Sequence, residues 1–202
     1  MLTTKQKLYI NLVKRPIGFL GALVALTLLS PLFIATIILL FFANKNGFKG
    51  IFFTQDRPGK NEKIFKAIKF KTMTDERDAD GKLLPDADRL TKVGKIIRST
   101  SIDELPQLIN ILKGDMAFIG PRPERKFYID QIMKHDARYV CLYQIRPGVT
   151  SYATLYNGYT DTMEKMLRRL KYDLFYLEHR SWWLDFKILF KTFVSIVFGK
   201  KF

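Results

Sequence analysis

Hydrophobic residues are concentrated near the N-terminus, where residues 17–42 include no charged side chain. As one straight helix this run would be about 39 Å long, which exceeds the roughly 30 Å hydrocarbon core of a bilayer. A cleaved signal peptide is one alternative, but its apolar core usually has about 7–15 residues and ends at small residues. This run is longer and ends in Leu39-Leu40-Phe41-Phe42, which favours a retained membrane segment.

Ser30 and Pro31 lie in the middle of this run. Proline removes a backbone donor and clashes with the preceding turn, so it kinks or breaks a helix, and the serine can deepen the bend. Positive residues prefer the cytoplasmic side of a membrane, and they flank both ends of the run: Lys5, Lys7, Lys14, Arg15, Lys45 and Lys49. We therefore expect residues 1–46 to form a re-entrant membrane helix broken at Ser30-Pro31. A kinked spanning helix is the alternative, because membrane helices tolerate proline.

The pattern in residues 47–202 predicts a separate cytoplasmic domain of the α+β class. Residues 51–54 and 64–71 are typical of two strands of a β-hairpin, with a turn at 57–61. Apolar residues at helical spacing predict several short helices, at 90–97, 104–113, 127–140 and 162–179. The acidic stretch 75–88 does not have the spacing of a calcium loop, so we expect a solvated loop there.

The C-terminal stretch 182–198 has apolar side chains at helical spacing: Trp182, Phe186, Leu189, Phe190, Phe193 and Val197. Lysines accompany them, at positions 187, 191, 200 and 201. One interpretation is a helix packed on the core of the domain. The other is an interfacial amphipathic helix, with tryptophan at headgroup depth and lysine facing anionic lipid. Both interpretations fit the pattern.

The net charge of +15 favours anionic partners, which include nucleic acids, anionic lipids and phosphorylated substrates. No helix-turn-helix, zinc or RNA-binding signature is present, so we do not expect a nucleic-acid partner. The single cysteine, Cys141, cannot form an internal disulfide.

Paired carboxylates at Asp103 and Glu104 are the strongest candidates for chemistry. Pro106 suits the first turn of a helix, so both acids are predicted at a helix N-terminus, where the dipole stabilises their charge. Simple capping is one interpretation, because Ser101 and Glu104 have capping-box spacing. The other interpretation is a nucleophile or metal ligand at neutral pH.

Cationic side chains on stiff backbone accompany the two acids. Pro121 and Pro123 hold the backbone on either side of Arg122, and Arg146 precedes Pro147-Gly148. Rigid arginines suit bidentate phosphate recognition. We therefore predict a phosphate site made by four cations: Lys71, Arg98, Arg122 and Arg146.

Taken together, these features resemble those of the bacterial sugar transferases, or small monotopic phosphoglycosyl transferases. The resemblance covers nearly the whole chain, from the segment around Ser30-Pro31 to about Lys191. Its landmarks, specific as an ordered set, are Phe53-Thr54-Gln55-Asp56-Arg57-Pro58-Gly59, Lys69-Phe70-Lys71-Thr72-Met73, Arg98-Ser99-Thr100-Ser101-Ile102-Asp103-Glu104-Leu105-Pro106-Gln107, Lys113-Gly114-Asp115-Met116, Gly120-Pro121-Arg122-Pro123-Glu124 and Arg146-Pro147-Gly148-Val149-Thr150.

The resemblance implies a re-entrant membrane helix, a small soluble part and interfacial helices at the bacterial inner (cytoplasmic) membrane, with the catalytic domain facing the cytoplasm. It implies that Asp103 attacks a UDP-sugar, releases UMP and forms a covalent aspartyl-phosphosugar. Undecaprenyl phosphate then accepts the sugar phosphate, which initiates glycan assembly for downstream glycosyltransferases. Asp103 and Glu104 match the family's dyad, and Mg²⁺ is its cofactor. A hard cation held by one or two carboxylates would also neutralise a diphosphate under attack.

One region departs from the common family pattern. Many members continue after Thr150 with Gly-Trp-Ala-Gln-Val-Asn-Gly-Arg, whereas this chain has Ser151-Tyr152-Ala153-Thr154-Leu155-Tyr156-Asn157-Gly158-Tyr159. We assign no binding role to this stretch.

Two rival functions are a membrane phosphatase acting on lipid diphosphates and a non-catalytic scaffold of the same fold.

Overall fold

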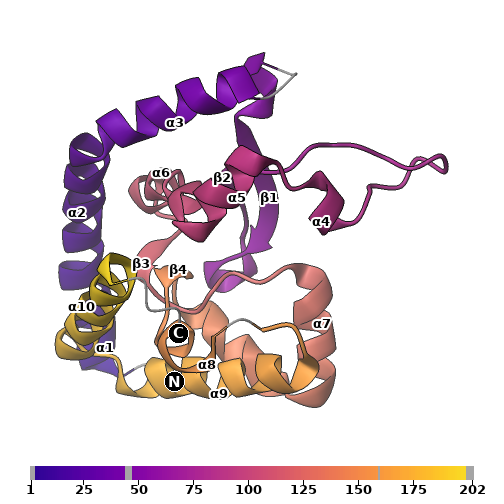
Figure 1. The fold of residues 1–202 in the computed structure, drawn as a ribbon. Coiled ribbons are helices and arrows are strands. Elements are labelled where there is room, and N and C mark those ends of the chain that lie inside the picture. The colour runs from indigo at the N-terminus through magenta and orange to yellow at the C-terminus, as the bar shows by residue number, and fades with distance from the viewer. Residues whose placement is uncertain (1–2, 44–46, 159, 199–202) are drawn as a thin grey trace.

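The computed structural model describes residues 3–43, 47–158 and 160–198. Within them, a long bent helical arm flanks a body in which helices surround two small sheets (Figure 1). The predicted mixture of helices and small sheets is therefore confirmed. Four of the residues discussed above lie outside the described residues: Lys45, Tyr159, Lys200 and Lys201.

The arm consists of consecutive helical segments joined end to end: α1 (Thr4–Leu8), a π-helical segment (Tyr9–Lys14), α2 (Arg15–Leu28) and α3 (Ser30–Ala43). A bend of 60° separates the last two. Pro31 lies in the first turn of α3, where its missing donor is tolerated, and the Ser30 hydroxyl donates to the Thr27 carbonyl over 2.7 Å. The helix is thus broken where the sequence predicted.

Among the described residues, no unbroken helix has both the length and the hydropathy of a membrane span. The bent pair of Leu12–Leu28 with Ser30–Ala43 meets these criteria jointly, by length and composition alone. In Figure 1, α2 runs along the left side of the body and α3 along its top, and the two helices meet at the bend.

Packing and hydrogen bonds join the arm to the body. Ala22 of α2 is fully buried against α6 (Gln107–Lys113). The Arg15 guanidinium donates to the carbonyls of Ile111 and Leu112 over 2.5 and 2.9 Å, and so satisfies the free carbonyls at the C-terminus of α6. Leu40 of α3 is buried in a second cluster. The predicted division at residue 46 stays a prediction, and residues 44–46 lie outside the described residues.

The predicted hairpin is present, with longer strands than expected. Strands β1 (Phe52–Pro58) and β2 (Ile64–Phe70) are antiparallel. The turn predicted from residue 57 was placed too early, because Arg57 and Pro58 still pair in the ladder, and proline is compatible with a strand end. The edge of β2 is completed by the buried Asn110 side chain, which donates to the Lys66 carbonyl over 2.8 Å and accepts from the Ile68 amide over 3.0 Å.

A second sheet was not predicted. Strand β3 (Ala117–Ile119) pairs in parallel with β4 (Gly148–Thr150). Each strand is too short to show an alternating pattern. The pairing brings the loops that contain Arg122 and Arg146 next to each other. The Gly120 amide donates to the Thr150 carbonyl over 3.1 Å, and the Gly148 amide donates to the Pro121 carbonyl over 2.9 Å.

Three other predicted helices are present to within a few residues, as α5 (Lys92–Ser99), α9 (Met163–His179) and α10 (Trp182–Val197), and the helix predicted at 127–140 is present as α7 (Lys126–His135). Two short helices were not predicted: α4 (Asp86–Arg89), at the end of the expected solvated loop, and α8 (Tyr152–Asn157). The helix predicted at 127–140 was too long. It ends at His135, where Asp136 adopts extended backbone and its carboxylate caps a separate 3₁₀ segment, Ala137–Gln144.

Helix α10 packs on the core through one side only. Ile188 is buried in the main cluster, whereas large apolar side chains on the remaining surface are exposed: Trp182, Trp183, Phe186, Leu189, Phe190 and Phe193. The two interpretations of this stretch are therefore compatible, since the same helix has a packed side and an apolar exposed side.

Candidate active site

Asp103 and Glu104 lie in a single 3₁₀ turn, Ile102–Glu104, between α5 and α6. The capping-box interpretation of Ser101 was wrong. Ser101 has a left-handed backbone (φ 58°) and its side chain makes no capping hydrogen bond; the Glu104 amide donates instead to the Ser101 carbonyl over 3.2 Å. Helix α6 begins at Gln107, so the two acids precede the helix and their side chains are free to face the hairpin.

The Glu104 carboxylate is held by two cations from different parts of the chain. Lys69 Nζ, at the end of β2, lies 2.5 Å from Glu104 Oε1, and Arg122 Nη2 lies 3.3 Å from the same oxygen. Lys69 Nζ also lies 3.8 Å from Asp103 Oδ2. One lysine therefore connects the two carboxylates, and Asp103 is the less tightly paired of them.

The two acids have opposite pKa shifts. Burial raises the pKa of Glu104, but the charges of Arg122 and Lys69 outweigh it, so the pKa lies below its usual value. Burial raises the pKa of Asp103 and the Glu104 charge adds to this, while Lys69 opposes it. Asp103 is only 8% exposed. A weakly solvated carboxylate beside a more tightly ion-paired one is chemically able to serve as a nucleophile with a supporting partner.

Arg122 is presented to Glu104 by the packing of two loops. A β-carbon at Gly120 would lie 2.4 Å from the Arg146 carbonyl oxygen, so the loops approach more closely than any other residue type would allow. Pro121 is buried and Pro123 is partly buried. The stiff loop predicted from the two prolines is thus anchored to the neighbouring strand β4, and it leads Arg122 toward the carboxylates.

The other predicted cations are not all part of this cluster. Arg98 is exposed on α5, and its charge acts on Asp103 without a hydrogen bond. Lys71 pairs with Asp75. Arg146 Nε donates to the Gly114 carbonyl over 2.7 Å, and its side chain lines a pocket together with Lys14, Arg15 and Arg180. The structure therefore brings together Asp103, Glu104 and Arg122.

Sequence reasoning missed Lys69 as a site residue. The side chain lies on the strand face that includes the buried Phe65 and Ala67, and a lysine in register with buried positions would have been the signal. The Lys69 side chain also lines a pocket next to Asp103 and Glu104. The other lining residues are Phe53, Gln55, Arg57, Ala67, Gln107, Arg122, Pro123 and Gly148. Three cations of this pocket, Arg57, Lys69 and Arg122, carry donors suited to an anionic ligand.

The dyad could hold a cation only with help from other ligands. Within the described part of the chain, no group of three His, Cys, Asp or Glu residues is placed to bind a metal. Mg²⁺ usually keeps several waters and is bound through one or two carboxylates plus substrate phosphates. Asp103 and Glu104 fit that type of site.

Comparison with known proteins gives one family. The family model described as "Bacterial sugar transferase" matches residues 9–199. The resemblance noted from the sequence motifs is confirmed by this match.

Three similar proteins illustrate the range of relatives. One, from Aeromonas hydrophila, is named UDP-N-acetylgalactosamine-undecaprenyl-phosphate N-acetylgalactosaminephosphotransferase and is 37% identical over 93% of this chain. A UDP-glucose:undecaprenyl-phosphate glucose-1-phosphate transferase from Klebsiella pneumoniae is 39% identical over 91%. The uncharacterized sugar transferase EpsL of Bacillus subtilis (strain 168) is 45% identical over 70%. The matches cover 44%, 40% and 67% of these relatives, in the same order, so the chain spans less than half of the first two.

Proposed function

The chain belongs to the bacterial sugar transferase family, and from this premise we propose that it transfers a sugar 1-phosphate from a UDP-sugar to undecaprenyl phosphate, with release of UMP. The observation that supports this most directly is the dyad itself. Asp103 lies beside an ion-paired Glu104, and both lie next to the cationic pocket of Lys69 and Arg122. A diphosphate bound there would meet fixed positive charge and a carboxylate nucleophile together.

The proposed reaction has two steps at one phosphorus atom. In the first, an Asp103 carboxylate oxygen attacks the sugar-bearing phosphorus, the bond to the bridging oxygen breaks, and UMP leaves with the electron pair. In the second, a phosphate oxygen of the lipid attacks the same phosphorus and Asp103 leaves as a carboxylate. The product is an undecaprenyl diphosphate sugar. A covalent intermediate lets a soluble and a lipid substrate use one site in turn.

The neighbouring residues have distinct proposed roles. Glu104 stays ionised because its pKa is lowered, so it keeps Lys69 and Arg122 oriented when no substrate is bound. Those two cations then interact with the phosphoryl oxygens, whose charge increases during transfer. Mg²⁺, bound by Asp103 or Glu104 together with substrate oxygens, would supply further charge neutralisation.

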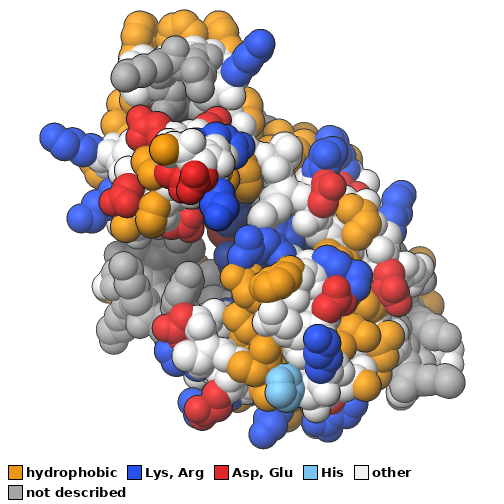
Figure 2. Space-filling model, turned by 90° about the vertical axis from the view of Figure 1, so that its right-hand side faces the viewer, with side chains coloured by type: hydrophobic (Ala, Val, Ile, Leu, Met, Phe, Trp, Pro, Cys, Tyr) orange, Lys and Arg blue, Asp and Glu red, His pale blue; other side chains and the backbone are white. Residues whose placement is uncertain are grey.

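The proposed location is the inner face of the cytoplasmic membrane, with α2 and α3 as a re-entrant arm. Support comes from the 60° bend between two apolar helices and from the exposed aromatic side of α10, both suited to lipid. Figure 2 shows Lys, Arg, Asp and Glu side chains interspersed with hydrophobic ones over the face that includes α4 and α7. Such a face suits the cytoplasm, where glycosyltransferases that extend the product would act.

The decisive experiment measures UMP release by the protein in nanodiscs containing undecaprenyl phosphate and Mg²⁺. A panel of UDP-sugars is needed because the named relatives use different sugars. We expect release that depends on the lipid and falls at least about a thousandfold in Asp103→Asn. The matched control is Asp161→Asn, which changes an exposed aspartate paired with Lys165.

Each contrary outcome points to a different function. Inorganic phosphate without UMP would indicate a lipid-diphosphate phosphatase. Full turnover by Asp103→Asn would remove that residue as the nucleophile, and no turnover with any donor would favour a scaffold.

A further inference from the structure

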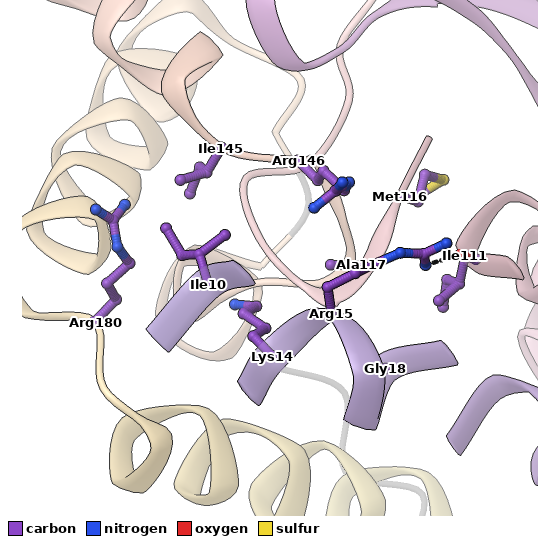
Figure 3. Close-up of a pocket in the computed structure, with 10 residues that line it drawn as sticks. All are labelled: Ile10, Lys14, Arg15, Gly18, Ile111, Met116, Ala117, Ile145, Arg146 and Arg180. Atoms are coloured by element: carbon purple, nitrogen blue, oxygen red, sulfur yellow. Dashed lines mark hydrogen bonds between the residues drawn. The ribbon is translucent and has the colours of Figure 1, made fainter. Parts of the chain in front are cut away.

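A second cationic pocket lies between the N-terminal arm and the C-terminal half of the body. Figure 3 shows four cations among its lining residues: Lys14 and Arg15 on the arm, Arg146 on the loop before β4, and Arg180 at the junction of α9 and α10. The Arg15 guanidinium points toward Ile111, to whose carbonyl it donates. The remaining lining residues are apolar or glycine: Ile10, Gly18, Ile111, Met116, Ala117 and Ile145. The pocket thus combines an apolar wall with four cations.

Arg180 is the unusual member of this group. Its residue is only 4% exposed, yet Nε and Nη1 are buried without a hydrogen-bond acceptor among the described residues. Its Nη2 donates to Gln6 Oε1 over a long 3.4 Å. Buried donors nearly always have a partner, and an unsatisfied charged donor is especially costly. The guanidinium therefore has donors that no described residue uses.

The nearby carboxylate cannot supply that acceptor. Asp185 is already held by Lys14 at 2.8 Å and accepts hydrogen bonds from the Tyr9 and Tyr176 hydroxyls over 2.7 and 2.5 Å. No acidic residue lines the pocket among the described residues. Because Asp185 compensates a single cation, the pocket keeps an excess of positive charge that favours a bound anion.

The pocket also lies at a defined depth if the arm is embedded as proposed above. Lys14 and Arg15 immediately precede the uncharged run 17–42, and Gly18 is in its first turn. When such a run occupies the hydrocarbon core, the cations before it lie at the level of the lipid headgroups. Lipid phosphates are therefore the most abundant anions at the mouth of the pocket.

We infer that this pocket binds the phosphate group of an anionic phospholipid, with Arg180 as its principal donor and the apolar wall against the adjoining acyl chain. This inference rests on the proposed membrane function for the depth of the arm. The bound lipid would bridge the arm to the α9–α10 junction. It would be a resident lipid, separate from the proposed substrate site, because its pocket shares no lining residue with the pocket of Lys69 and Arg122.

The test is native mass spectrometry of the protein released from nanodiscs that contain equal amounts of phosphatidylcholine and phosphatidylglycerol. We expect the wild-type protein to retain phosphatidylglycerol selectively, and Arg180→Gln to retain it about tenfold less, the effect of losing one charge-assisted hydrogen bond. The control for charge alone is Arg168→Gln, on α9, whose side chain is exposed and paired with Glu164.

A second variant covers the case in which Arg180→Gln does not fold. A β-carbon at Gly18 would meet no atom within 4 Å, so Gly18→Leu starts from open space and adds apolar volume at the pocket wall, and leucine favours a helix more than glycine does. It too should lose selective retention. If folded Arg180→Gln or Gly18→Leu retains phosphatidylglycerol as the wild type does, the inference is overturned.

Two further measurements separate the sources of the phosphate and the two proposals. Displacement of the lipid by millimolar inorganic phosphate or glycerol phosphate would indicate a soluble anion site and would overturn the lipid assignment. UMP release is measured on the same protein preparations in nanodiscs that also contain undecaprenyl phosphate, with Mg²⁺ and the UDP-sugars. Release without selective lipid retention contradicts only this inference, whereas retention without Asp103-dependent release contradicts only the proposed function.

Discussion

Lys69 Nζ lies 2.5 Å from Glu104 Oε1, although the two residues are 35 positions apart in the chain. This ion pair fastens the end of β2 to the turn that includes Asp103. It also defines how the two acids differ, because the same amino group lies 3.8 Å from Asp103. Glu104 is thereby engaged in the closer ion pair, which supports the proposed role of Asp103 as the nucleophile.

Replacement of this lysine should change both the rate and the pH dependence of UMP release. We expect Lys69→Met to lower the rate about 100-fold, since one fixed donor to the phosphoryl oxygens is lost. The lysine charge also lowers the pKa of Asp103. Its removal should raise that pKa further, so activity, which needs the ionised carboxylate, should be lost at a higher pH than in the wild type.

A matched control lies on the same strand. Lys66 is exposed and pairs with Asp56 at 3.3 Å, so Lys66→Met removes an equal charge from the opposite face of β2. Its pH profile should coincide with that of the wild type. A Lys69→Met profile that loses amplitude without moving along the pH axis would mean that the lysine does not act on the Asp103 charge.

Glu104→Gln should lower the free energy of unfolding at neutral pH and change it little at acid pH. The pKa of Glu104 is lowered in the folded protein, so its charge stabilises the fold above the ordinary value of 4.5, and this contribution is lost as the pH falls through the lower, folded value. We expect a loss of about 1–2 kcal/mol at neutral pH, less than for a fully buried pair, because the Arg122 side chain is 40% exposed.

Thermal unfolding of the nanodisc-embedded protein across this pH range checks the prediction. The difference in unfolding temperature between the wild type and Glu104→Gln should become smaller toward acid pH. A difference that is constant with pH would show that the loss comes from packing and not from the carboxylate charge.

Gly120→Ala should disturb the site through the backbone. Its β-carbon would lie 2.4 Å from the Arg146 carbonyl oxygen, so the two loops must separate, at a cost of about 1–3 kcal/mol. Arg122 would then move away from Glu104, and UMP release should fall together with the unfolding temperature. The control is Gly18→Ala in α2, where a β-carbon meets no atom within 4 Å and helix propensity predicts a gain of up to about 1 kcal/mol. Unchanged activity in a folded Gly120→Ala would contradict the role of this close approach.

The sequence predicted the elements that have a strong local cause. The helix break at Ser30-Pro31, the hairpin and the C-terminal helix follow from proline chemistry and from the spacing of apolar side chains. The pairing of β3 with β4 could not be predicted, because three-residue strands have no periodicity and their partners are distant in sequence. Asn110 illustrates the same limit, since nothing in its neighbourhood shows that it completes the edge of β2.

The site was predicted to a similar extent. Asp103, Glu104 and Arg122 were identified from residue type and local stiffness, and they do lie together. Lys69 and Lys71 are two positions apart in the chain and have the same side chain. Which of them belongs to the site therefore depends on tertiary contacts. Lys69 meets Glu104 across the chain, whereas Lys71 is engaged locally by Asp75. The prediction of a capping box failed for a related reason, because Ser101 has a left-handed backbone and its side chain makes no capping hydrogen bond.

The interfacial placement of α10 can be tested with intrinsic fluorescence. The chain has two tryptophans, Trp182 and Trp183, whose residues are 62% and 61% exposed. If this side of α10 lies in the headgroup region, as tryptophan prefers, lipids brominated near the glycerol end of their acyl chains should quench most of the emission. Aqueous iodide should quench little. The reverse result, with strong iodide quenching and no effect of brominated lipid, would place the exposed side of α10 in water and leave it as a surface for another protein. Single Trp182→Phe and Trp183→Phe variants assign the signal to each ring and serve as controls, because each keeps an aromatic side chain on the helix.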